Sequence, residues 1–170
     1  MILVVADTSP IHYLVLVEAV ELLPQLYDRV VLPKAVLTEL THPHAPAPVK
    51  AWATALPRWA EVRTAAHVAL GGILDPGEAE AIALAQELKA DSVLLDESEA
   101  RAEALRLGLP VSGTVGVLEK AAERELIDLP AVFQRLSRTN FHISPELLNE
   151  ALRRDTARRA LRDRKRGMER

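Results

Sequence analysis

Short apolar runs that alternate with helical patterns are the feature of this 170-residue sequence that most restricts its fold. The runs at 2–6, 29–32 and 92–95 have the length of strands, and the continuous apolar stretch at 2–6 is typical of a strand buried on both faces. Each is followed by a helical pattern. This rhythm predicts an α/β fold with a central, mainly parallel sheet flanked by helices on both faces.

Composition limits the chemistry and the compartment. The chain has no cysteine, which excludes disulfides, thiolate metal sites and cysteine nucleophiles and favours a reducing compartment. Its first residues lack the basic region of a signal peptide, and no stretch has the length and apolar character of a membrane span. We therefore expect a cytoplasmic protein without a membrane partner.

The helical patterns have recognisable starts. Ser9 and Pro10 predict the N-cap and first position of a helix that continues to about Leu22. Later helices are expected from Pro33, over 49–56, 97–107, 115–126 and 128–138, and from 145 to about 166, with an extended segment at 60–63. Asp75-Pro76-Gly77 is a helix-start signal for a further helix over 78–88. Within the helix 78–88, the heptad spacing of Glu80 and Glu87 predicts a solvated stripe.

Two aspartates directly follow predicted strands. Asp7 ends the first run and Asp96 ends the run at 92–95. In a parallel sheet the ligand crevice lies beyond the carboxyl ends of the strands, so both side chains are expected to face one site. Such an aspartate can instead simply cap the next helix, but Ser9 is available for that role in the first helix.

Two glutamates extend this group. Glu78 is predicted on the buried side of its helix, where a carboxylate needs a partner, although the helix dipole alone also favours an acid in a first turn. Glu39 is predicted in the last turn of its helix, where the dipole disfavours an anion and something else must compensate. Four converging carboxylates would suit Mg²⁺ or Mn²⁺, which prefer oxygen ligands.

These segments together resemble a known family. Asp7-Thr8-Ser9-Pro10, Glu39 after a Val-Val-Leu-Pro strand, Gly77-Glu78-Ala79-Glu80-Ala81-Ile82, Leu94-Leu95-Asp96-Glu97 and 111–118 are similar to PIN-domain proteins. The most similar branch comprises predicted nucleic-acid-binding PIN proteins of bacteria and archaea, which are related to toxin ribonucleases of the VapC kind. The resemblance covers about residues 2–145.

The resemblance implies a function and a site. It makes Asp7, Glu39, Glu78 and Asp96, hereafter the four-acid set, the catalytic metal ligands, with Thr8 or Ser9 near the metal. Glu97 adjoins Asp96 and is a candidate supporting residue, with the solvated start of a helix as the alternative interpretation. It implies a Mg²⁺- or Mn²⁺-dependent endoribonuclease, the toxin of a toxin and antitoxin pair, with an RNA substrate, a small antitoxin partner and a homodimeric state. The expected domain organisation is a PIN-like nuclease domain at 1–145 and a basic tail or helix at 146–170.

The tail leaves a second function open. Residues 151–170 contain nine Arg or Lys and three acids, a net charge of +6, whereas the whole chain carries −3. A nucleic-acid-binding face is predicted there from partly helical spacing of basic residues, namely Arg153, Arg154, Arg158, Arg159 and Arg162. The tail could equally be a solvated helix or pack on a second subunit. The alternative function is a non-catalytic PIN-like module that binds RNA or a protein.

Overall fold

The computed structural model describes residues 1–69 and 71–170. The chain divides into two compact units, Met1–Val115 and Gly116–Arg170. We describe each unit by itself.

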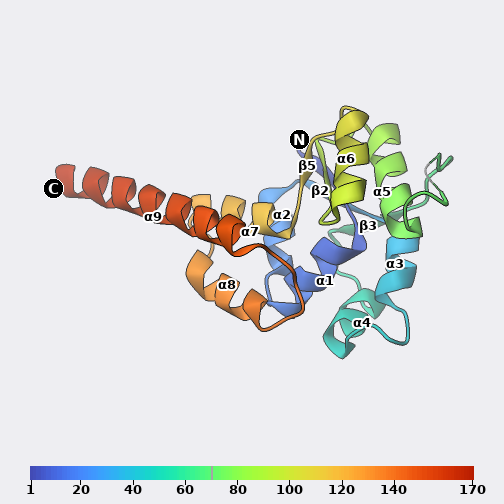
Figure 1. The fold of residues 1–170 in the computed structure, drawn as a ribbon, viewed down its shortest axis with the longest axis horizontal. Helices are drawn as coiled ribbons and strands as arrows, with labels where there is room; N and C mark the ends of the chain where they lie inside the picture. Colours follow the sequence, from blue (N-terminus) through green and yellow to red (C-terminus); the bar gives the residue numbers. More distant parts are fainter. Residues whose placement is uncertain (70) are drawn as a thin grey trace. The chain divides into compact units, whose positions relative to one another are not determined.

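A parallel sheet organises the first unit (Figure 1). Its strands lie in the order β3-β2-β1-β4-β5, and every neighbouring pair is parallel. The strands are β1 (Leu3–Ala6), β2 (Arg29–Pro33), β3 (Ala60–Arg63), β4 (Ser92–Leu94) and β5 (Val111–Ser112). The predicted α/β class and parallel sheet are confirmed.

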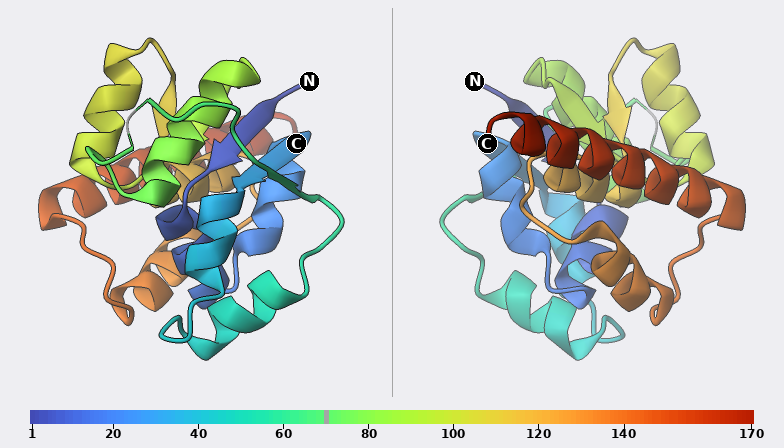
Figure 2. Two further views of the ribbon diagram at one scale, coloured as in Figure 1. Left: turned by 90° about the vertical axis from the view of Figure 1, so that its right-hand side faces the viewer. Right: turned by 90° about the vertical axis from the view of Figure 1, so that its left-hand side faces the viewer.

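Helices cover both faces of this sheet. The connections that leave β1 and β2 contain α1 (Thr8–Leu16), the 3-10 turn Val20–Leu22, α2 (Leu23–Leu26), α3 (Lys34–Leu40) and α4 (Ala47–Thr54). The chain then reverses direction across the sheet, and the connections to β4 and β5 contain α5 (Pro76–Glu87) and α6 (Ser98–Arg106). Because parallel crossovers are right-handed, this reversal places α5 and α6 on the opposite face. Figures 1 and 2 show α5 and α6 side by side.

The core explains the apolar runs. All four residues of β1 are buried, and alternate strand residues such as Val5, Val31 and Val93 pack in one cluster with α5 residues including Ile82. Residues between them on the strands, such as Val4, are equally buried. A strand covered on both faces must be apolar at consecutive positions, as the sequence predicted.

Two expectations about the helices are wrong. The helix predicted to run from Pro10 to Leu22 ends at Leu16, and Glu18 then adopts a positive φ of 58° that breaks it. Glu80 is not on a solvated stripe: it is 7% exposed, and its carboxylate accepts hydrogen bonds from the backbone N–H of Ala35 (2.8 Å) and Ala65 (2.9 Å). Heptad spacing could not reveal these donors, since they belong to other segments.

The second unit contains helices near the predicted positions. They are α8 (Leu129–Ser137) and α9 (Pro145–Met168), preceded by α7 (Thr114–Glu123), which begins just before the boundary. Leu129, Val132, Phe133 and Leu136 recur at helical spacing on α8 and are buried. In the part of the chain that the structure describes, no helix has the length and apolar character needed to cross a membrane.

Candidate metal centre

The site lies where two neighbouring strands end. β1 and β4 are paired in register, with Ala6 opposite Leu94, and the backbone N–H of Asp7 donates to the Leu94 carbonyl at 3.0 Å. Asp7 directly follows β1, and Asp96 follows two residues after the end of β4. The helices after these strands cover opposite faces of the sheet, so the two aspartates lie at the reversal point where α/β proteins form their ligand crevices.

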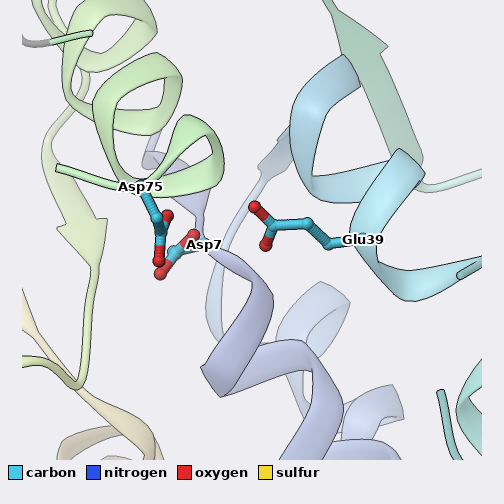
Figure 3. A group of neighbouring side chains, drawn as sticks. All are labelled: Asp7, Glu39 and Asp75. Carbon is cyan, nitrogen blue, oxygen red and sulfur yellow. The ribbon is translucent and has the colours of Figure 1, made fainter. Parts of the chain in front are cut away.

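Three carboxylates converge at this point: Asp7, Glu39 and Asp75, hereafter the three-carboxylate cluster. One oxygen atom from each lies within 4.8 Å of the others. Figure 3 shows Asp7 between Asp75, at the start of α5, and Glu39, on α3. The sequence predicted Asp7 and Glu39 here, whereas Asp75 was interpreted only as part of a helix start.

Asp7 is the most buried member of the cluster. It is 4% exposed, and its Oδ1 atom is buried without a hydrogen-bond donor among the residues described. Burial raises the pKa of Asp7 well above its usual value, the Thr8 N–H lowers it, and the negative charges of Asp75, Glu39 and Glu78 raise it further. A buried anionic oxygen without a donor, surrounded by other carboxylates, is suited to a bound cation.

Donors from two elements hold Glu39. The Thr8 hydroxyl donates to Oε2, and the Gly77 backbone N–H donates to Oε1 at 3.0 Å. Gly77 lies in the first turn of α5, whose free N–H groups favour an anion. These contacts supply the compensation that the position of Glu39 in the last turn of α3 requires.

Gly77 lets the first turn of α5 approach these acids closely. A Cβ atom at position 77 would lie 2.8 Å from both carboxylate oxygens of Glu39 and 2.9 Å from Oδ1 of Asp7. Both distances are shorter than a carbon atom tolerates. The site geometry therefore requires glycine at position 77. The sequence analysis named Gly77 only as part of the segment that resembles PIN-domain proteins.

Glu78 lies beside the cluster rather than within it. It is 7% exposed and forms a capping box with Asp75: the Glu78 N–H donates to Asp75 Oδ1 at 2.9 Å, and the Asp75 N–H donates to Glu78 Oε2 at 3.4 Å. Burial, followed by the charge of Asp75, raises the pKa of Glu78 to about 7. The predicted burial of Glu78 is confirmed, and the capping role accounts for part of its placement.

Asp96, the fourth predicted ligand, is held by a separate set of donors. Its Oδ2 accepts from the Ser9 hydroxyl (2.8 Å) and the Thr114 hydroxyl (2.7 Å), and its Oδ1 accepts from the Thr114 backbone N–H (2.8 Å). Among the residues described, the group with ligand atoms within 4.8 Å does not include Asp96. Ser9 is therefore not the helix cap that the sequence predicted: α1 begins at Thr8, and Ser9 instead orients a carboxylate.

The surroundings of Asp96 include residues that the sequence analysis missed. A Cβ atom on Gly113 would lie 2.7 Å from Asp96 Oδ1, and Arg101 donates from Nη1 to the Leu95 carbonyl at 2.8 Å. Gly113 and Thr114 were visible only as part of the segment 111–118. Glu97, the predicted supporting residue, is exposed at the N-cap of α6, and its charge raises the pKa of Glu78.

Most of the tail arginines predicted to bind nucleic acid form ion pairs within the second unit. The pairs are Arg154 with Glu119 (2.9 Å), Arg158 with Glu123 (3.8 Å), Arg159 with Asp128 (2.8 Å) and Arg162 with Glu125 (3.6 Å), while Arg153 is exposed. Ion pairs between exposed side chains contribute little to stability, because solvent screens them. Neighbouring acids nevertheless offset much of the positive charge proposed to attract a polyanion.

Two comparisons with known proteins found a match. A family model described as PIN domain matches residues 3–156, which extends past the boundary between the two units. Among solved structures, the chain is similar to a PilT N-terminus domain protein from the hyperthermophilic archaeon Sulfolobus solfataricus P2, with 15% identity and a TM-score of 0.46 over 84% of this chain and 100% of that chain. No curated protein matches the chain.

Proposed function

Because the chain belongs to the PIN-domain family, we propose that it is a divalent-metal-dependent endoribonuclease that hydrolyses RNA phosphodiester bonds. The observation that carries the proposal is the buried Oδ1 of Asp7, which lacks a donor among the described residues and lies within a cluster of carboxylates. If these carboxylates had only a structural role, the buried charge of Asp7 would destabilise the fold, because a buried charge needs a partner.

The four-acid set would hold Mg²⁺ or Mn²⁺. Such an ion, when bound, lowers the pKa of a coordinated water and offsets charge that develops on the phosphate. The residues of this chain prepare the site for it: Thr8 and Gly77 orient Glu39, and Ser9 and Thr114 orient Asp96. Ligands fixed in advance by such donors need little rearrangement when the cation and the substrate bind.

The biological role proposed is that of a toxin restrained by a small antitoxin, in a cytoplasmic homodimer. It rests on the family likeness of the segments around Asp7, Glu39, Glu78 and Asp96. The alternative of a non-catalytic RNA-binding module draws less support, because the arginines it would use are largely paired with Glu119, Glu123, Glu125 and Asp128.

A cleavage assay tests the proposal. The purified protein is incubated with a mixture of structured RNAs, with Mn²⁺ or with a chelator, beside Asp7→Asn and Asp96→Asn variants. We expect cleavage only with Mn²⁺ and at least about 100-fold less of it in both variants, as is usual when a group that stabilises the transition state is removed. Glu99→Gln, which removes an exposed acid from the first turn of α6, is the matched control and should cleave normally.

Two results would count against the proposal. Cleavage that persists in the chelator or in Asp7→Asn would exclude this site as its source. RNA that stays intact in every lane but binds the protein would favour the binding module, and binding that falls when residues 151–170 are removed would assign it to the tail.

A further inference from the structure

We propose that Asp75 is a cation ligand together with Asp7 and Glu39, in addition to being the N-cap of α5; this proposal rests on the metal-dependent function proposed above. It adds to the four-acid set a residue whose sequence context, Asp-Pro-Gly before a helix, is fully explained by capping. In the structure, Asp75 also lies close to Asp7 and Glu39, and capping does not require this proximity.

The position of Asp75 is the first observation. Its Oδ1 accepts the Glu78 N–H and so fulfils the cap. The same side chain also places an oxygen within 4.8 Å of oxygens of Asp7 and Glu39. Like charges this close repel each other, so a cap chosen for helix stability alone would be better placed elsewhere.

The second observation is independent of capping. Asp7 is 96% buried, given its exposed fraction of 4%, and its Oδ1 finds no donor in the described structure. Figure 3 shows the Asp75 and Asp7 carboxylates adjacent to each other, with the Glu39 carboxylate pointing toward them. A cation shared by the three would neutralise the orphan oxygen and relieve their repulsion, and hard divalent ions take such oxygen ligands.

This assignment couples cation binding to the start of α5. Asp75 ends the loop before the helix, and Gly77 in the first turn donates to Glu39. A cation held by Asp7, Glu39 and Asp75 therefore connects β1, α3 and the first turn of α5. Cation binding is expected to stabilise this turn as well as to supply the reactive centre.

The Asp75→Asn variant separates the two roles. Asn and Asp are nearly equivalent N-caps, so the helix start is kept, whereas the carboxylate charge is lost. Mn²⁺ binding to the full-length protein is measured by isothermal titration calorimetry, and the Tm is measured in chelator. We expect at least about tenfold weaker Mn²⁺ binding, since even partners outside the ligand shell contribute that much. The Tm in chelator should stay the same or rise, because the variant keeps the cap and loses a charge that repels Asp7 and Glu39.

Further variants secure the interpretation. Asp75→Ser also retains a good cap and should show the same loss of Mn²⁺ affinity, while Glu99→Gln should bind Mn²⁺ as the wild type does. If the wild type binds Mn²⁺ and both Asp75→Asn and Asp75→Ser bind it with the same affinity, only the assignment of Asp75 is overturned. A wild-type protein that binds no Mn²⁺ would overturn both this assignment and the metal-dependent function.

Discussion

Replacing Gly77 by alanine should destabilise the protein, although the same change usually stabilises a helix. The added Cβ would lie 2.8 Å from both oxygens of Glu39 and 2.9 Å from Oδ1 of Asp7. An ordinary contact begins at 3.4 Å, so α5 or the carboxylates must move by about 0.5–0.6 Å. Glu39 is held by Thr8 and by Gly77 itself, and Asp7 is buried, so neither carboxylate moves freely.

The expected magnitude follows from two opposing terms. Overpacking a tight site costs about 1–3 kcal/mol. The helix preference of alanine over glycine returns at most about 0.5–1 kcal/mol. The mid-range values of the two terms leave a net loss of unfolding free energy of about 1 kcal/mol, which lowers the Tm of a protein of this size by about 2–4 °C.

Thermal unfolding followed by far-UV circular dichroism measures this loss, and the fluorescence of Trp52 and Trp59 provides a second probe of the first unit. Gly167→Ala is the matched control, because a Cβ there meets nothing within 4 Å in the described structure and that glycine also lies in a helix. It should leave the Tm unchanged or raise it slightly. A Gly77→Ala protein as stable as the wild type would refute the close approach of α5 to Glu39 and Asp7.

Two further predictions concern the buried carboxylates. Without a cation, lowering the pH from 8 to 5.5 should raise the unfolding free energy by roughly 1–3 kcal/mol. The reason is that the pKa of Glu78 is about 7 in the folded protein, above its usual 4.5, so the folded protein binds a proton more tightly than the unfolded chain across that window. Urea titrations at several pH values measure this effect. Glu78→Gln should flatten the curve in part, because the raised pKa of Asp7 acts in the same direction, and a rise in stability with pH would contradict the assigned burial. Glu80→Ala should lower the unfolding free energy by about 2–3 kcal/mol in the same titrations, because the N–H groups of Ala35 and Ala65 lose their acceptor. The control Glu99→Ala, which changes an exposed residue, should alter it by less than about 0.5 kcal/mol. Equal losses in the two variants would show that these contacts contribute nothing.

The sequence by itself determined the alternation of strands and helices, apart from α2 and β5, and the strand ends that carry Asp7 and Asp96. Both follow from local rules: a strand covered on two faces needs consecutive apolar residues, and the first acid after such a run marks the point where the strand leaves the core. The helix starts predicted at Pro33, at the Asp75-Pro76-Gly77 signal and at Pro145 were also close to those observed, because caps and prolines act on their own helix.

Only the tertiary structure decided which polar groups meet. Glu39 receives a hydrogen bond from Gly77, 38 positions away, and Asp96 receives one from Ser9, 87 positions away. Glu80 lies on the polar stripe of a heptad pattern but is buried against N–H donors from two other segments. A periodic pattern records which side of a helix avoids water, but the partner of a buried carboxylate depends on how distant segments pack, and that is a property of the folded chain alone.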